Sequence, residues 1–290
     1  MKEALLYARL DDGSIQCNVC PHRCKIRPGR RGICHTRMNE ADRLVALNYG
    51  LSVAVAVDPI EKKPLYHFLP GSRIYSFAAS GCNFHCPFCQ NWEISQLESD
   101  TTTCPGKPLS PEEHVEWALH YHLPAIAYTY TEPTVFLEYA LDTMKEAKAH
   151  DLKNVWVSNG FMTPETLNLI LPYLDAANID LKAPDDGTYE RVCGGSAKPV
   201  MDTIKTMIQH KVHVEITTLI VPGINDRREQ IQAIAAFIAE EVGTEVPWHL
   251  SRFFPAWKMK ATAPTPMATL VMARDIAVHA GLKHIHLGNI

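Results

Sequence analysis

The chain has 290 residues, a formal net charge of −4 and 46% hydrophobic residues, enough for one large domain or two modest ones. It carries no long basic stripe, so we do not expect it to bind nucleic acid. No run approaches the roughly 18 apolar residues of a membrane span, and residues 1–14 lack the apolar core of a signal peptide. We therefore expect a cytoplasmic protein with no membrane partner, in which clustered cysteines are more often metal ligands or catalytic groups than disulfides.

Residues 1–72 differ from the rest of the chain. They are rich in Arg, Gly and Pro, and a β-like stretch covers residues 44–57. They also hold four closely spaced cysteines, which are Cys17, Cys20, Cys24 and Cys34. We predict that residues 1–72 form a cysteine-rich N-terminal extension and that residues 73–290 form the main domain.

From residue 73 onward, strand-like segments alternate with helix-like segments. Strands are predicted at residues 73–79, 125–130, 155–158, 177–181, 212–220, 248–253 and 284–288. Helices are predicted from residue 111 and over residues 134–150, 163–172, 200–210, 228–240 and 266–280. Ser110, Pro111 and Glu113 give the first helix a capping box. This alternation predicts an α/β fold whose parallel sheet curls into a barrel or partial barrel, with binding loops at the carboxyl ends of the strands.

Three cysteines follow the first predicted strand directly, in the segment GCNFHCPFCQNWEISQ. They are Cys82, Cys86 and Cys89. Closed structural metal sites usually take four protein ligands, so three thiolates suit a cubane iron–sulfur cluster whose fourth iron is open to another ligand. Phe84 and Phe88 would shield such a cluster from water. The alternatives are zinc with a histidine such as His85 as fourth ligand, or three unligated thiols.

The four N-terminal cysteines have the spacing C-x2-C-x3-C-x9-C. Four thiols within eighteen residues suit zinc or a second iron–sulfur cluster, because this segment has little other core. The alternative is that the thiols are reduced and buried in a packed extension. The spacing does not separate zinc from a cluster.

The C-x3-C-x-aromatic-C motif after the first strand resembles that of the radical S-adenosylmethionine (radical SAM) superfamily. The longer segment KKPLYHFLPGSRIYSFAASGCNFHCPFCQNWEISQ is similar to the branch around pyruvate formate-lyase activating enzymes. The segments CNVCPHRCKIRPGRRGICHTR, TYTEPT, VSNG, NIDLKAP and LIVPGIND together resemble the radical SAM enzyme of the AmmeMemoRadiSam system. The resemblance runs from about residue 15 to the end of the chain.

This resemblance implies a partial (β/α)6-type radical SAM barrel and an oxidoreductase-like mechanism. A reduced 4Fe-4S cluster would bind S-adenosylmethionine at its open iron, and one electron would cleave the sulfonium bond. The products would be methionine and a 5′-deoxyadenosyl radical, which abstracts hydrogen from a substrate. We expect an electron donor such as flavodoxin or ferredoxin, and a small-molecule substrate. The alternatives are an activase that installs a glycyl radical on a partner protein, and a non-catalytic iron–sulfur or zinc module.

Polar residues at the ends of the second and third predicted strands are candidates to bind S-adenosylmethionine. Glu132 can accept hydrogen bonds from the ammonium group of the cofactor, although it also suits a helix N-terminus. Ser158 and Asn159 can bond the ribose hydroxyls, although the segment also suits an ordinary β–α turn. Activating enzymes usually carry an aspartate just before this motif, where this chain has Val157.

Later strands add further candidates. Asp180 and Lys182 share one strand face, and the resemblance places both beside the cofactor; the alternative is a self-contained ion pair. His249 is predicted to lie near the adenine or the substrate, although a lone strand histidine is more often structural. Cys193 is a candidate hydrogen donor or substrate contact, and Phe88 a cofactor contact.

Overall fold

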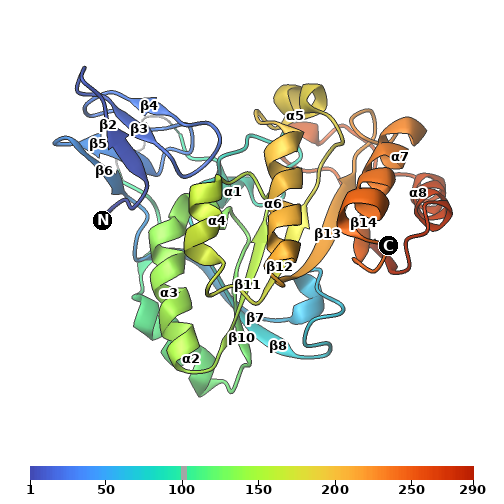
Figure 1. Cartoon of the computed structure of the whole chain (residues 1–290), viewed down its shortest axis with the longest axis horizontal. Helices are drawn as coiled ribbons and strands as arrows, with labels where there is room; N and C mark the ends of the chain where they lie inside the picture. Colours follow the sequence, from blue (N-terminus) through green and yellow to red (C-terminus); the bar gives the residue numbers. More distant parts are fainter. Residues whose placement is uncertain (99–102) are drawn as a thin grey trace.

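The computed structural model describes residues 1–98 and 103–290, and its central feature is a mixed sheet of nine strands (Figure 1). The strand order is β15-β14-β13-β12-β11-β10-β8-β7-β9. The bounds are β7 (Leu51–Pro59), β8 (Arg73–Ala79), β9 (Lys107–Pro108), β10 (Ala125–Tyr128), β11 (Lys153–Ser158), β12 (Ala176–Asp180), β13 (His213–Ile220), β14 (Trp248–Arg252) and β15 (Ile285–Gly288).

The seven strands from β8 through β10 to β15 pair in parallel. They correspond to the seven strands that the sequence predicts, and the predicted α/β partial barrel is confirmed. The division at residue 72 stays a prediction. Strand β7 precedes that boundary, yet it pairs antiparallel with both β8 and β9.

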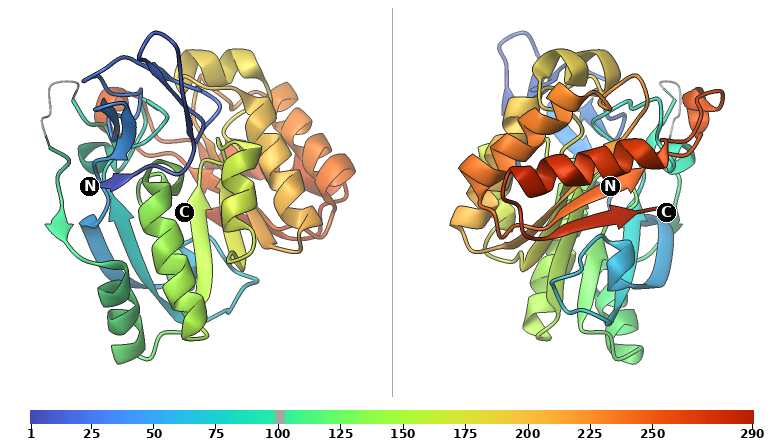
Figure 2. Two further views of the ribbon diagram at one scale, coloured as in Figure 1. Left: turned by 60° about the vertical axis from the view of Figure 1, so that its left-hand side comes forward. Right: turned by 90° about the vertical axis from the view of Figure 1, so that its right-hand side faces the viewer.

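Helices follow the parallel strands and pack beside the sheet (Figure 2). The six predicted helices are present as α2 (Pro111–His120), α3 (Leu137–Ala149), α4 (Pro164–Ile170), α6 (Ala197–Gln209), α7 (Arg228–Phe237) and α8 (Met267–His279). Two more were not predicted, α1 (Trp92–Ser95) and α5 (Asp186–Val192). Short helical turns lie at η1 (Ile60–Lys62), η2 (Pro133–Phe136), η3 (Ile238–Val242) and η4 (Trp257–Met259).

The capping box predicted for α2 is present. The Ser110 hydroxyl accepts a bond from the Glu113 backbone at 3.2 Å, and the Glu113 carboxylate accepts one from the Ser110 backbone at 2.6 Å. Two backbone N–H groups at the helix start, which have no partner within the helix, are thereby satisfied.

The N-terminal extension forms two small antiparallel sheets beside α3 and α4 (Figure 1). Their strands are β1 (Lys2–Glu3), β6 (Arg43–Ala46) and β5 (Arg37–Glu40) in one sheet, and β2 (Tyr7–Arg9), β3 (Ile15–Cys17) and β4 (Lys25–Ile26) in the other. Arg37 joins the extension to α3 through a fully buried, bidentate pair with Glu138, at 3.0 and 2.7 Å. The planar guanidinium suits such a fork, so this pair fixes the orientation of the extension.

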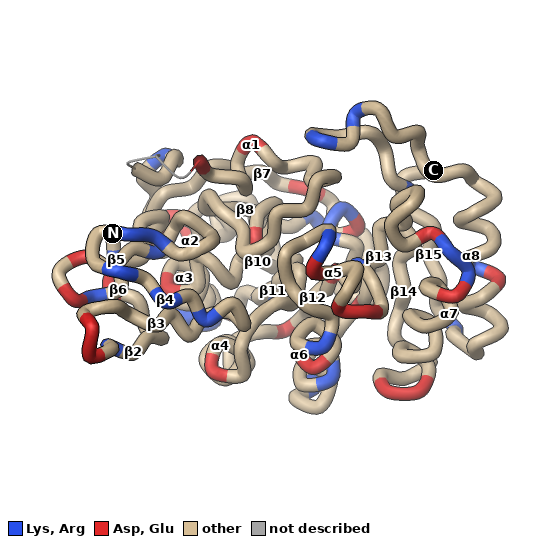
Figure 3. The backbone as a smooth tube through the Cα atoms, turned by 90° about the horizontal axis from the view of Figure 1, so that it is seen from above, with Lys and Arg blue, Asp and Glu red and all other residues tan. Residues whose placement is uncertain are grey.

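Positive and negative side chains are interspersed along helices such as α6 and α8 (Figure 3). In the described part of the chain, none of the helices combines the length and the apolar character that crossing a bilayer requires.

Candidate functional site

A cavity of about 320 Å³ lies at the carboxyl ends of the parallel strands, where β–α loops converge. It is lined by most of the predicted site residues: Cys82, Cys86, Phe88, Cys89, Glu132, Ser158, Asn159, Asp180 and Lys182. These residues come from the ends of four successive strands, β8, β10, β11 and β12. The strand order therefore gathers into one cavity side chains that lie a hundred residues apart in sequence.

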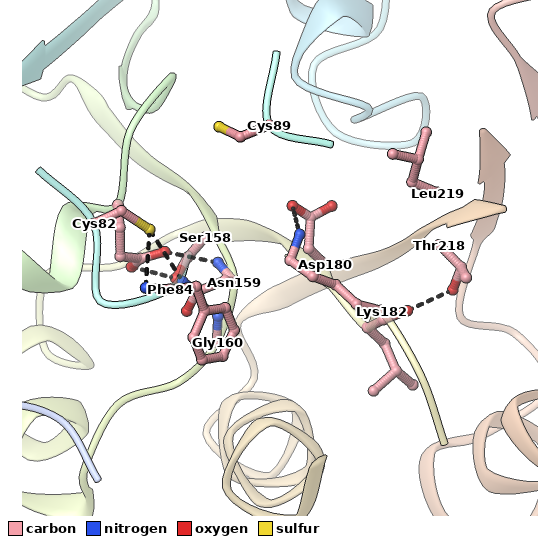
Figure 4. A network of polar contacts seen from close by, with 12 residues as sticks. Cys82, Phe84, Cys89, Ser158, Asn159, Gly160, Asp180, Lys182, Thr218 and Leu219 are labelled. Carbon is pink, nitrogen blue, oxygen red and sulfur yellow. Dashed lines mark hydrogen bonds and ion pairs between the residues drawn. The ribbon is translucent and has the colours of Figure 1, made fainter. Parts of the chain in front are cut away.

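The cysteine loop follows β8, the last parallel strand in the sheet order, which lies next to the antiparallel strand β7. The Cys82 sulfur accepts bonds from the Phe84 backbone at 3.4 Å and from the Asn159 amide at 3.8 Å (Figure 4). The Cys89 sulfur lies 3.3 Å from the Ser95 hydroxyl. Polar donors thus reach these two sulfur atoms from neighbouring segments, as they do around sulfur ligands of metals.

The three thiols differ in their electrostatic surroundings. Burial and the nearby Glu132 carboxylate hold the pKa of Cys82 well above its usual range, and burial also raises the pKa of Cys89. A hydrogen bond from the Cys193 thiol lowers the pKa of Cys86 against the effect of burial, and the Lys182 ammonium lowers it further. A bound iron would reverse the first two shifts, because metal coordination deprotonates thiols.

Glu132 is a buried carboxylate that organises two loops. Its Oε1 atom accepts bonds from the Thr134 backbone at 3.0 Å, the Thr134 hydroxyl at 2.6 Å and the Ser158 hydroxyl at 2.8 Å. Its Oε2 atom accepts one bond, from the Asn159 backbone at 2.8 Å. Burial raises the pKa of Glu132, although these bonds oppose the rise. Because a carboxylate oxygen has about two acceptor positions, Oε2 keeps room for another donor.

Asp180 and Lys182 form an ion pair on the cavity wall, with 3.0 Å between Nζ and Oδ2 (Figure 4). Burial opposes the charge of Lys182, but the Asp180 carboxylate and the nearby Cys86 thiol raise its pKa well above the usual range. Asn225 supports this wall, since its side-chain amide donates to the Lys182 carbonyl at 2.7 Å. The cavity wall therefore carries a charged lysine, paired with Asp180, beside the cysteine loop.

A family model described as the Radical SAM superfamily matches residues 78–238, more than half of the chain. The chain belongs to the radical SAM superfamily. It is a radical SAM enzyme, and membership implies that it uses a 4Fe-4S cluster and S-adenosylmethionine. The cysteine loop fits such a cluster, because its three thiols and an open cavity lie together at the strand ends.

Two curated relatives place this radical SAM enzyme more closely. It is 44% identical to an uncharacterized protein of Methanocaldococcus jannaschii over 290 residues, which is 100% of this chain and 86% of the relative. It is 25% identical to the pyruvate formate-lyase-activating enzyme of Clostridium pasteurianum over 190 residues, which is 62% of this chain and 76% of the relative. The predicted relation to activating enzymes is confirmed, while the AmmeMemoRadiSam assignment stays a prediction.

The fold is also similar to that of a solved radical SAM enzyme. The radical SAM methyltransferase from Sphaerobacter thermophilus superposes with a TM-score of 0.59 at 13% identity, covering 77% of this chain and 68% of that one. At this identity the likeness shows the shared fold alone.

Two predicted radical SAM site residues lie outside the set that lines the cavity. Cys193 directly follows α5, is buried, and faces Cys86 rather than the cavity. His249 points to Glu215, with 2.7 Å between Nε2 and Oε2. The roles predicted for Cys193 and His249 stay predictions.

His249 belongs to a polar cluster within the sheet. The Glu215 carboxylate is fully buried and also accepts bonds from His213 at 3.0 Å and from the backbone of Tyr66 and His67 at 3.1 and 2.8 Å. Burial alone would raise the pKa of Glu215, but the bonds from the two histidines hold it well below its usual range. This cluster ties the segment before β8 to β13 and β14.

Several cavity residues were not predicted from the sequence. Lys63, Tyr130, Thr217, Ser251 and Asn289 line the cavity. Lys63 is buried and pairs at 2.8 Å with Asp58, which the Tyr130 hydroxyl also contacts. Only the period-2 alternation of β13 and β14 signals any of them, because it places Thr217 and Ser251 on the inner face.

Proposed function

We propose that this radical SAM enzyme cleaves S-adenosylmethionine reductively and removes a hydrogen atom from a small-molecule substrate. The observation that carries this proposal is the shared cavity, which brings the three loop thiols together with the charged and polar ends of three further strands. A non-catalytic metal module would not need an ion pair and a buried carboxylate beside its thiols.

In this proposal Cys82, Cys86 and Cys89 hold a 4Fe-4S cluster. When bound, the cluster supplies one electron that splits S-adenosylmethionine into methionine and a 5′-deoxyadenosyl radical. Phe84 and Phe88 are buried around the loop, and Phe84 packs on Phe161 with ring centroids 4.9 Å apart. These rings exclude water from the thiols, which protects reactive intermediates from side reactions.

The remaining wall residues would bind S-adenosylmethionine. The free acceptor position on Glu132 Oε2 suits the ammonium group, and Lys182 suits the carboxylate. Ser158 and Asn159 lie next to Glu132 and suit the ribose hydroxyls. Each contact is charge-assisted or polar in a buried cavity, so it fixes orientation as well as affinity.

The part of the cavity beyond these residues is also polar. Thr217, Ser251 and Asn289 lie on its wall, and the Asn289 amide donates to the Ser251 hydroxyl at 3.0 Å. Such a wall supports a small polar substrate. A reductant is usual for radical SAM enzymes, and we propose a flavodoxin or ferredoxin in a cytoplasmic setting.

The second candidate function is that of an activase that installs a glycyl radical on a partner protein. It is favoured by the curated relatives, among them the isethionate sulfite-lyase activating enzyme of Oleidesulfovibrio alaskensis, at 24% identity over 150 residues. The experiment below separates the two.

The test is formation of 5′-deoxyadenosine by anaerobic, reduced enzyme given S-adenosylmethionine and fractions of a host lysate. We expect stimulation by the small-molecule fraction, and deuterium from a labelled substrate should then appear in the nucleoside. Stimulation by the macromolecular fraction alone would replace the first candidate by the activase. No nucleoside under any condition would overturn both.

A further inference from the structure

The four cysteines of the N-terminal extension meet at a second cavity, which is separate from the radical SAM cavity. They are Cys17, Cys20, Cys24 and Cys34. The volume is about 20 Å³, room for roughly one water-sized atom. The rest of the lining is mostly apolar, with Val19, Ile26 and Ile33 among it. A set of four thiols around an atom-sized space suits a single ion better than a four-iron cube.

A neighbouring side chain donates to one of these thiols. The Thr36 hydroxyl bonds the Cys34 sulfur at 3.3 Å. A donor to sulfur stabilises a thiolate, which is the form that binds metals.

Arg37 gives independent support, because this residue lines the cavity and one of its buried polar atoms has no hydrogen-bond partner among the described residues. Its side chain is 2% exposed, and its two terminal nitrogens bind Glu138. Its Nε atom has no hydrogen-bond partner among the described residues, although Arg37 lines the cavity. A buried donor without an acceptor is costly. Thiolates in the cavity would supply the missing acceptor and the negative charge that a buried guanidinium favours.

We propose that Cys17, Cys20, Cys24 and Cys34 bind one zinc ion as a closed, structural site with four cysteine ligands. Four thiolates around a divalent ion keep a net negative charge, which Arg37 offsets from the cavity wall. In the described residues no three His, Cys, Asp or Glu side chains are arranged around one ion. The proposal therefore requires that the four thiols, which already line one cavity, rotate toward its centre when zinc binds.

The zinc site has a place in the enzyme because it adjoins the cysteine loop of the barrel. Asn83, the residue after Cys82, lines the zinc cavity, and its carbonyl lies 2.8 Å from His22 Nε2. Thr163 and Thr166, at the start of α4, donate to the Val19 carbonyl from the other side, at 3.2 and 2.7 Å. Zinc would thus fix the position of the extension against the loop that carries the radical SAM thiols.

The first test is the metal content of the anaerobically purified full chain, measured by elemental analysis. We expect about one zinc ion per chain, lost in Cys20→Ser and kept in Cys104→Ser, which changes a buried thiol outside both sites. A variant with Cys82, Cys86 and Cys89 all changed to Ala should lose iron and keep zinc, so this test does not depend on the proposed radical SAM activity. Iron in that triple variant that Cys20→Ser removes would overturn zinc in favour of a second cluster.

A second test uses wild-type protein and avoids the risk that Cys20→Ser fails to fold. Zinc is removed with a chelator and replaced by Co²⁺, whose absorption reports its ligands. We expect intense thiolate-to-cobalt charge-transfer absorption together with the visible bands of a tetrahedral ion, and displacement of both by added zinc. Absence of these bands, or zinc content no higher than in Cys20→Ser, would overturn the proposal.

Discussion

The two cysteine groups of this radical SAM enzyme lie on neighbouring segments but in opposite surroundings. The loop thiols Cys82, Cys86 and Cys89 line a cavity of about 320 Å³, with charged residues on its wall. The four extension thiols line a cavity of about 20 Å³ with mostly apolar walls. The comparison teaches that the number of cysteines and the space around them vary together. Three thiols with open space leave a position for chemistry, whereas four thiols in a closed space leave none.

The largest expected effect concerns the three thiols of the barrel loop. Cys86→Ala should abolish 5′-deoxyadenosine formation and the iron of the barrel cluster, because the cluster then loses one of the three thiolates proposed to hold it. Zinc content should be unchanged. Anaerobic nucleoside assays and metal analysis measure both, with Cys104→Ala as the matched control. Nucleoside formation at the wild-type rate in Cys86→Ala would show that the loop does not hold the cluster.

The next effect concerns how the extension is held to the barrel. Glu138→Gln leaves the Arg37 guanidinium buried without its carboxylate, so we expect a loss of about 3–5 kcal/mol in the free energy of unfolding. The control is Glu165→Gln, which breaks a second arginine pair between the extension and a barrel helix, Arg23–Glu165. That pair is 39% and 44% exposed, so its loss should cost about 0.2–1 kcal/mol. Denaturant unfolding measures the loss of stability in both variants. Equal losses would contradict the conclusion that the buried Arg37–Glu138 pair anchors the extension.

The third prediction concerns the charge of Lys182 on the wall of the barrel cavity. Lys182→Met removes the ammonium group that we assign to the S-adenosylmethionine carboxylate. A hydrogen bond to a charged group contributes about 1.5–3 kcal/mol, so the dissociation constant should rise roughly 10- to 150-fold. The Asp180 side chain is 36% exposed, so water can solvate its carboxylate after the change. Equilibrium binding measures the constant.

The control for that measurement is Lys198→Met, which removes an exposed lysine that pairs with Asp202 on α6. Affinity for S-adenosylmethionine should be unchanged in this variant. If Lys182→Met also binds with wild-type affinity, the Asp180–Lys182 pair is structural and the cofactor carboxylate binds elsewhere.

The sequence predicted which residues would gather at the carboxyl edge of the sheet. The cysteine loop, Glu132, Ser158 and Lys182 line one cavity because parallel strands end at one edge, while the roles predicted for them stay predictions. The sequence was less informative where the burial of a side chain and its hydrogen-bond partner determine its role. His249 was expected near the cofactor, but its partner Glu215 lies thirty-four residues away, and sequence periodicity does not reveal such pairs.

Non-local pairing was the other limit. Residues 44–57 were predicted to be β-like, yet nothing in their sequence shows that strand β7 pairs with β8. That pairing brings Asp58 and Lys63 toward the cavity, so both were missed. The sequence likewise left the metal of the extension open, and the proposal of zinc depends on the cavity volume and on the unpartnered Nε of Arg37.

The smallest effect tests the contact between the two cysteine regions. Gly81 has φ +103, and a Cβ atom there would lie 2.4 Å from Thr36 Cγ2 and 3.2 Å from the Cys34 carbonyl oxygen. Gly223 has φ +76, but the described part of the chain places nothing within 4 Å of its Cβ position. Both alanine variants meet backbone strain, and only Gly81→Ala also meets a neighbour. We expect Gly81→Ala to cost about 1–3 kcal/mol more than Gly223→Ala in denaturant unfolding. Equal costs would mean that Thr36 moves aside freely, and the extension would then not hold the cysteine loop in register.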